Sequence, residues 1–203
     1  MSLRAAVLWR RGSPSAGWEI ASPGKKRRVR NDTSMKPFPR RTYRSPRALF
    51  SDLGYVMRRR RLIRTAFRQQ LSPAFRERLM LAVTAVNACR YCSYFHAGEA
   101  LRSGVPAEQL AELLAGQIPT GAPPEEQVAM LYAQHWAERD ARPAPEATQR
   151  LLEAYGPEKA EAIHLALRMI RMGNLLGNSG DAVLYYLSFG RLGAPNLTPS
   201  PLP

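Results

Sequence analysis

Apolar residues recur three and four positions apart along most of the chain after residue 45, and this spacing is typical of amphipathic helices. Two of the helices begin with the same signal, because Ser45-Pro46 and Ser72-Pro73 each set a capping serine before a proline at the first helical position. No segment shows the alternation of a strand, so the sequence predicts an all-α protein that folds as a compact helical bundle. The predicted helices cover residues 46–67, 73–86, 88–103, 106–115, 125–141, 145–155 and 158–187.

Several of these boundaries depend on single residues that interrupt the apolar pattern. Asn87 ends one apolar run, and we expect it to cap the helix that follows. Gly156 is expected to end the helix before it. The last helix is expected to be broken by Gly173, Gly177 and Gly180, because glycine inside a helix costs roughly 1 kcal/mol relative to alanine.

Composition divides the chain into three parts. Residues 1–45 are rich in Pro, Gly, Ser, Lys and Arg, which predicts a basic and disordered extension. Residues 46–190 form the predicted helical domain, and residues 191–203 form a Pro-rich tail. Met35 follows a stretch with little folding information, so it is an alternative start of the protein.

Positive charge is concentrated near the N-terminus. Residues 1–70 contain 19 Lys and Arg against 3 Asp and Glu, whereas the rest of the chain contains 11 against 13. The basic runs Lys25–Arg30 and Arg58–Arg61 suit non-specific contact with a polyanion, and the alternative is a solvated tail and a charged helix face. Because no apolar run reaches about 18 residues, we expect no transmembrane segment. The close spacing of the only two cysteines argues for redox or metal chemistry in a reducing compartment, so we expect a cytoplasmic protein.

Both cysteines of the chain lie in one short motif. Cys89, Cys92 and His96 follow the pattern Cys-x-x-Cys-x-x-x-His, and this spacing puts all three side chains on one face of a helix. Two thiols beside an imidazole predict either a redox pair or part of a metal site. The zinc alternative would use these three residues with Glu77 as a fourth ligand, and the simplest alternative is two buried structural cysteines.

The redox interpretation requires a thiol that ionises readily. An ordinary cysteine has a pKa near 8.5, so only about 3% of it is the reactive thiolate at pH 7. The N-terminus of the motif helix would favour a thiolate at Cys89, and His96 lies four residues after Cys92, where it can take a proton. The second thiol would resolve a sulfenic acid on the first to a disulfide. We therefore expect no cofactor beyond a redox-active Cys89–Cys92 disulfide, and no metal.

Glu77 extends the motif to Glu-x11-Cys-x-x-Cys-x-x-x-His. With this pattern, residues 73–116 resemble the carboxymuconolactone decarboxylase family and, within it, the alkyl hydroperoxidase D-like branch. The resemblance implies an all-helical fold of that type and a homo-oligomer, either a trimer or a hexamer. It implies that Cys92 is the peroxidatic thiol, that Cys89 is the more exposed partner that resolves it, and that His96 and Glu77 form a proton relay. Tyr91 departs from the pattern, because many relatives have histidine or another polar residue just before the second cysteine.

These observations lead to the hypothesis of an enzyme, an alkyl hydroperoxide reductase-like peroxidase with a hydroperoxide substrate. Its electrons would come from a thiol or dihydrolipoyl-type reductant, or would pass to a peroxiredoxin-type partner. One alternative is a carboxymuconolactone decarboxylase-like lactone enzyme that uses His96 as a general base. Another is a basic binding module whose helices are only a scaffold. His135 and His164 have no cysteine or histidine neighbours in sequence, so we expect them to be packing or surface residues.

Overall fold

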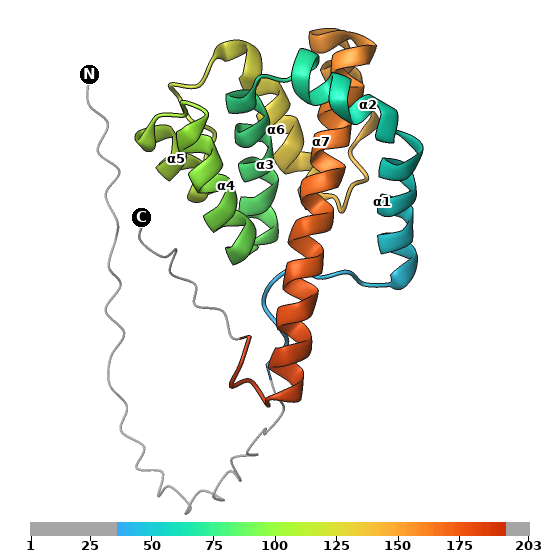
Figure 1. Ribbon diagram of the computed structural model, residues 1–203, viewed down its shortest axis with the longest axis vertical. Coiled ribbons are helices and arrows are strands. Elements are labelled where there is room, and N and C mark those ends of the chain that lie inside the picture. Colours follow the sequence, from blue (N-terminus) through green and yellow to red (C-terminus); the bar gives the residue numbers. More distant parts are fainter. Residues whose placement is uncertain (1–35, 194–203) are drawn as a thin grey trace, which may run out of the picture. The chain divides into compact units, whose positions relative to one another are not determined.

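The computed structural model describes residues 36–193, and this part of the chain is helical without strands, so the all-α prediction is confirmed (Figure 1). Residues 1–35 and 194–203, which carry most of the predicted extension and of the Pro-rich tail, lie outside the described residues. The helices are α1 Pro46–Arg58, α2 Arg60–Thr65, the π-helical turn η1 Ala66–Gln70, α3 Pro73–Asn87, α4 Arg90–Arg102, α5 Ala107–Leu114, α6 Pro124–Glu138 and α7 Pro145–Leu187.

Both predicted serine caps are present. The Ser45 hydroxyl accepts a hydrogen bond from the Ala48 N–H at the start of α1, and Ser72 accepts one from the Phe75 N–H at the start of α3. The predicted continuous helix 46–67 is wrong, however, because the chain leaves helical geometry at Arg59. Arg59 has its side chain directed toward α7, where it pairs with Glu161.

Helix α7 is interrupted once, and the interruption is not at any of the three glycines where breaks were predicted. Gly156, at φ 70° and ψ 169°, separates two helical parts, as expected from its position before a proline. The helix then continues through Gly173, Gly177 and Gly180 to Leu187, so the predicted breaks there are wrong. Packing against α1, α3, α4 and α6 outweighs the low helix propensity of these glycines.

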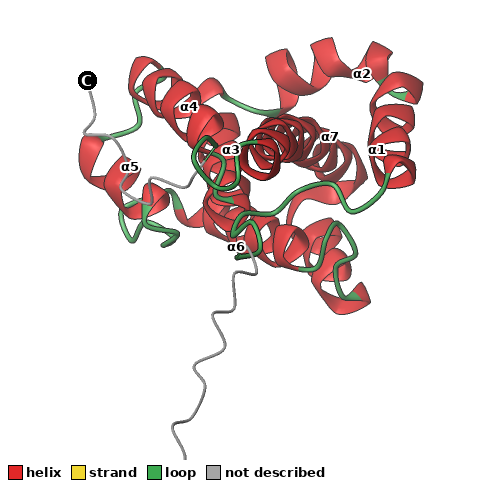
Figure 2. Ribbon diagram, turned by 90° about the horizontal axis from the view of Figure 1, so that it is seen from below, coloured by secondary structure: helices red, strands yellow, loops and turns green. Residues whose placement is uncertain are grey.

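Helix α3 is the centre of the domain. It packs against α4, α5, α6 and α7, with α4 and α5 on one side and α1 and α2 on the far side of α7 (Figures 1 and 2). Its side chains are buried on nearly all faces between Phe75 and Thr84, which is the pattern of a helix enclosed by neighbours. Glu77 and Asn87, near its two ends, are therefore polar groups inside the protein and require partners.

Residues 36–45 differ from the predicted disordered extension, because they lie along α7 and are bound to it. Arg40 is buried and pairs with Asp181, and the Tyr43 N–H donates to the Ser179 hydroxyl at 3.1 Å. We call residues 36–45 the N-terminal strap. Their composition resembled that of a loose tail, but buried ion pairs and hydrogen bonds with α7 fix their course. No helix within residues 36–193 is long and apolar enough to cross a membrane.

Candidate functional site: a thiol pair at the start of α4

The motif begins at a sharp junction between α3 and α4. Ala88 adopts a left-handed conformation with φ 55°, and its N–H donates to the Thr84 carbonyl, so α3 ends there. Asn87 was expected to cap the next helix, and this is wrong. Asn87 is the last residue of α3, and its carbonyl accepts a hydrogen bond from the Asn178 side chain at 2.7 Å. The residue at the N-cap of α4 is Cys89 itself.

The two sulfur atoms lie side by side. Cys89 Sγ and Cys92 Sγ are 2.7 Å apart, and Cys89 Sγ also accepts a hydrogen bond from the Cys92 N–H at 3.4 Å. Both residues are free cysteines in this structure, and a disulfide bond would require an approach to about 2.05 Å. The N-cap position thus brings one sulfur to free backbone N–H groups and to the second thiol.

The environment of the pair favours a thiolate on Cys89. A hydrogen bond from the Cys92 thiol, together with the backbone N–H groups of Cys92 and Tyr91 and the charge of Arg40, lowers the pKa of Cys89 to about 7 although burial opposes this. The pKa of Cys92 is raised, first because its proton is held by Cys89, and also by burial and by the Cys89 charge. At pH 7 the pair therefore carries more thiolate than an ordinary thiol, of which only about 3% is ionised.

The exposure of the two cysteines is opposite to that implied by the resemblance. Cys89 was expected to be the more exposed sulfur, but its exposed fraction is 0%, whereas Cys92 is partly exposed. The reason is the N-cap position, which directs Cys89 into the junction between α3, α4 and α7. Cys92 lies one turn further on, nearer the surface.

Two glycines of α7 make room for the sulfurs. A Cβ atom at Gly177 would lie 3.4 Å from Cys89 Sγ and 3.6 Å from the Tyr91 ring, and one at Gly173 would lie 3.9 Å from Cys92 Sγ. The four-residue spacing puts both glycines on one face of α7. This face lets the thiol pair pack directly against the helix backbone.

Glu77 and His96 meet across α3 and α4. His96 Nδ1 is 2.7 Å from Glu77 Oε2, and the other carboxylate oxygen, Oε1, accepts a hydrogen bond from Arg76 Nε at 3.1 Å. The Glu77 side chain is almost fully buried, so its partners fix the orientation of the imidazole. Within residues 36–193, no hydrogen bond joins His96 to either sulfur. The sequence named Cys89, Cys92, His96 and Glu77 as site residues, and the structure brings them together as two pairs, Cys89 with Cys92 and Glu77 with His96.

In the described part of the chain, no three His, Cys, Asp or Glu side chains are arranged so that they could hold a metal ion. The zinc alternative therefore finds no ligand cluster there. The other two histidines serve packing: His164 Nε2 is 2.8 Å from the Tyr132 hydroxyl, and His135 Nε2 accepts the Ala144 N–H at 3.2 Å.

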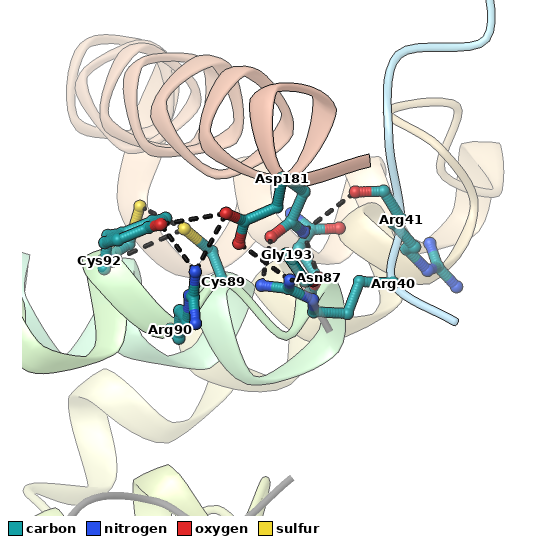
Figure 3. A network of polar contacts seen from close by, with 10 residues as sticks. Arg40, Arg41, Asn87, Cys89, Arg90, Cys92, Asp181 and Gly193 are labelled. Atoms are coloured by element: carbon teal, nitrogen blue, oxygen red, sulfur yellow. Dashed lines mark hydrogen bonds and ion pairs between the residues drawn. The ribbon is translucent and has the colours of Figure 1, made fainter. Parts of the chain in front are cut away.

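A buried carboxylate that sequence reasoning missed lies beside the thiol pair (Figure 3). Asp181 on α7 is 2% exposed, and its Oδ1 accepts hydrogen bonds from the Tyr91 hydroxyl at 2.8 Å and from Arg90 at 3.0 Å. Its Oδ2 accepts one from Arg40 at 2.7 Å. Burial alone would raise the pKa of Asp181, but these three donors outweigh burial and lower it. Asp181 therefore remains ionised and links the N-terminal strap, α7 and the first turn of α4.

Some of these partners carried a sequence signal and others did not. The spacing of Gly173 and Gly177 was visible, but it was interpreted as weakness of the helix and not as a face that contacts the two sulfurs. Asp181 stands among small and apolar residues, which is a signal for a buried carboxylate. Arg40 had no signal, because it lies in a segment with no apolar period.

Comparison with known protein families gives a match. The model of the carboxymuconolactone decarboxylase family matches residues 55–135, from α1 to α6, and this range contains Glu77, Cys89, Cys92 and His96. Arg40 and Asp181 lie outside the matched range. No curated protein and no solved structure gives a significant match.

Proposed function

Residues 55–135 belong to the carboxymuconolactone decarboxylase family, and from this premise we propose that the protein is a thiol-dependent peroxidase or disulfide oxidoreductase of the alkyl hydroperoxidase D-like type. Family membership supports hydroperoxidase-like or lactone decarboxylase-like roles in general. The observation that favours the redox role is the thiol pair, with sulfurs 2.7 Å apart and one of them at a helix N-cap with a pKa lowered to about 7. By the resemblance, the decarboxylases of this family do not rely on such a cysteine pair, so its presence argues against that activity.

The proposed cycle has three balanced steps. A thiolate attacks the terminal oxygen of a hydroperoxide; the O–O bond breaks, the sulfur becomes a sulfenic acid, and the alkoxide takes a proton to leave as an alcohol. The second thiol attacks the sulfenic sulfur, which forms the disulfide and releases water. A thiol or dihydrolipoyl-type reductant then reduces the disulfide to two thiols and is itself oxidised to a disulfide. In the alternative cycle, the reduced thiol pair passes its two electrons to the disulfide of a peroxiredoxin-type partner, which becomes a dithiol while Cys89 and Cys92 form their disulfide.

We assign the first attack to Cys92 and the resolving role to Cys89. Cys92 is the partly exposed sulfur, so a peroxide reaches it first. The thiolate charge rests on Cys89, and transfer of the Cys92 proton across the 2.7 Å between the sulfurs moves that charge to the exposed atom. The pair keeps its total charge in this transfer, and Cys89 then holds the proton that water formation needs in the second step.

The proposed roles of His96 and Glu77 are to supply protons to the reaction at the thiol pair. The carboxylate fixes His96 Nδ1 at 2.7 Å, so Nε2 is the ring nitrogen left to exchange a proton. His96 lies one helical turn after Cys92, which is the sulfur assigned to attack. We propose that it donates the proton that the departing alkoxide requires, with Glu77 stabilising the charged imidazolium.

The test is peroxide consumption with dithiothreitol or dihydrolipoamide as the reductant. Wild type is expected to turn over, and Cys89→Ser and Cys92→Ser are each expected to lose turnover, whereas Ser93→Ala on the same helix keeps it. If both cysteine variants keep wild-type turnover, the redox proposal is wrong. Loss of carbon dioxide from a lactone substrate that depends on His96 and not on the cysteines would then favour the decarboxylase alternative.

An exposed aromatic stripe beside the site supports the proposal of a homo-oligomer. Tyr91, Tyr94 and Phe95 have exposed fractions of 52%, 67% and 58%, and their spacing puts them on one face of α4. Contiguous exposed apolar surface of this kind is typical of protein contacts. Light scattering is expected to show a trimer or hexamer for wild type and a smaller species for Tyr94→Ser. A monomeric wild type would contradict the proposal.

A further inference from the structure

The N-terminal strap reaches the thiol site through one side chain. Arg40 comes from outside the segment matched by the family model, and its guanidinium lies between α7 and the start of α4 (Figure 3). It donates to Asp181 Oδ2 at 2.7 Å, to the Asn178 side chain at 3.4 Å and to the Gly193 carbonyl at 3.0 Å. The Arg40 side chain is only 4% exposed, so the ion pair with Asp181 is screened little by solvent.

Asn178 and Asp181 connect this arginine to both sides of the motif. Asn178 donates to the Asn87 carbonyl at 2.7 Å and to the Arg41 carbonyl at 2.9 Å, so it ties the end of α3 to the strap. Asp181 accepts from Tyr91 and Arg90, the two residues that directly follow Cys89. The hydrogen bonds of Arg40 therefore fix the residues on both sides of the buried sulfur.

The charges around Cys89 explain why a cation is needed there. Asp181 on α7 is a buried carboxylate, and alone it would disfavour a thiolate nearby. The groups that offset it are Arg90 on α4, whose side chain is 41% exposed, and the buried Arg40 on the strap. Because exposed charges are weakened by solvent, Arg40 supplies most of the compensation. Its Nε is buried without a hydrogen-bond partner within the described residues, so its donors are not all used by Asp181 and its neighbours.

We propose that Arg40 is a positioning residue of the thiol site, which holds Asp181 against the first turn of α4 and offsets the negative charge that this carboxylate places beside Cys89. The inference rests on the proposed redox function of the pair. It also gives the strap a role, because the family-matched segment alone contains neither Arg40 nor Asp181. The positive charge of Arg40 acts in the direction that lowers the pKa of Cys89.

The test measures ionisation and does not require peroxidase turnover. The ultraviolet absorbance of the thiolate is followed from pH 5.5 to 10 on the full chain, because the buried Cys89 is closed to an alkylating reagent. For Arg40→Gln we expect the midpoint of the lower titration, which belongs to Cys89, to rise by about 0.5 to 1 pH unit, which lowers the thiolate fraction below the midpoint roughly three- to tenfold. Arg40→Lys keeps the charge and is expected to restore most of the midpoint.

Two further variants separate this role from a loss of local structure. Asp181→Asn keeps a hydrogen-bonding side chain but removes the negative charge, so we expect the Cys89 midpoint to fall below that of wild type. Local unfolding would instead raise it toward an ordinary thiol value in both variants. Arg61→Gln removes the same charge from an exposed position on α2 and is expected to leave the midpoint unchanged.

The outcomes are distinct. A rise for Arg40→Gln with a fall for Asp181→Asn supports the proposal, even if the protein reduces no peroxide. An unchanged midpoint in Arg40→Gln overturns it, and so does a rise of the same size in Arg61→Gln or in Asp181→Asn. If wild type has an ordinary Cys89 midpoint near 8.5, the basis of the proposed redox function fails as well, and this is visible before any variant is made.

Discussion

The carboxylate of Glu77 lies 2.7 Å from Nδ1 of His96, although the two residues come from different helices. The contact exists because α3 and α4 pack side by side after the sharp turn at Ala88. A buried carboxylate that accepts a hydrogen bond from one imidazole nitrogen fixes the tautomer of the ring and the direction of the other nitrogen. This arrangement orients the second ring nitrogen of His96, a residue that lies one helical turn after Cys92.

If Glu77 and His96 supply protons during peroxide reduction, Glu77→Gln should lower the second-order rate constant with hydroperoxide by about 100-fold. This is the lower end of the rate factor that positioned acid–base groups contribute. The glutamine keeps the shape of the side chain but cannot stabilise an imidazolium. Stopped-flow measurement of peroxide consumption gives the rate constant. Glu99→Gln, a carboxylate of α4 that pairs only with Arg102 among the described residues, is the control and should match wild type. Equal rates in both variants would remove Glu77 from the mechanism.

The order of attack within the thiol pair can be determined by trapping. With a substoichiometric amount of peroxide and dimedone present, we expect the sulfenic acid adduct on Cys92, because Cys89 is buried while Cys92 is partly exposed. Peptide mass spectrometry locates the adduct. In Cys89→Ser the adduct on Cys92 should accumulate, since no second thiol is present to resolve it. An adduct found first on Cys89 would reverse the assigned roles.

The pH dependence of stability follows from the same thiol. The pKa of Cys89 is lowered to about 7 in the folded protein, against about 8.5 in the unfolded chain. Between these values the unfolded state binds more protons, so the free energy of unfolding rises with pH. The contribution is complete above about pH 8.5 and is lost as the pH falls through 7. The raised pKa of Cys92 offsets part of this gain at pH 9, because Cys92 ionises in the unfolded chain and not in the folded protein. Urea unfolding at pH 6 and pH 9 should therefore show wild type gaining about 1 kcal/mol more than Cys89→Ser, in which Cys92 has no neighbouring thiolate. An equal gain in both proteins would mean that Cys89 titrates normally.

The glycines of α7 offer a matched pair of substitutions. A side chain at Gly177 begins 3.4 Å from Cys89 Sγ, whereas one at Gly180 meets nothing within 4 Å. Gly177→Leu should therefore displace the thiol pair and destabilise the fold by about 1 to 3 kcal/mol through overpacking. Gly180→Leu should be neutral or slightly stabilising, because leucine favours a helix over glycine. Chemical denaturation measures both, and equal effects would show that Gly177 is not a packing position.

The sequence predicted most of the fold because helix signals are local. The serine caps at Ser45 and Ser72 and the break at Gly156 are short-range patterns, and the structure contains each of them. The predicted helix boundaries are wrong where contacts with residues distant in sequence determine where a helix ends. Arg59 ends α1 because Glu161 lies near it on α7, more than a hundred residues later.

Residues of the candidate site could be predicted from helical spacing only where they share one helix. The spacing of Cys89, Cys92 and His96 follows from helical geometry, and Glu77 was placed through resemblance to a family. The exposure of the two cysteines was predicted the wrong way round, since it depends on Cys89 being the N-cap. Arg40 joins Asp181 over 141 residues of sequence, and no local pattern contains that information.

Asp52 and Asp140 provide a test of how far burial controls the strength of an ion pair, because both bind Arg171. The Asp52 side chain is 1% exposed, whereas the Asp140 side chain is 51% exposed. Asp52 also pairs with Arg168 and accepts a hydrogen bond from the Tyr43 hydroxyl. Asp52→Asn leaves two arginines without their buried counter-charge, so we expect a loss of about 3 to 5 kcal/mol in the free energy of unfolding.

Asp140→Asn removes the same charge from the same arginine at an exposed position, so we expect a loss below about 1 kcal/mol. The backbone at Asp140 has φ 53°, a conformation that asparagine also tolerates, so the substitution adds no strain. Urea unfolding of both variants at pH 7 measures the difference, and the thiolate absorbance of the thiol pair should stay at the wild-type value in the folded state of each. Losses of equal size would show that the buried network around Asp52 is no stronger than a surface ion pair.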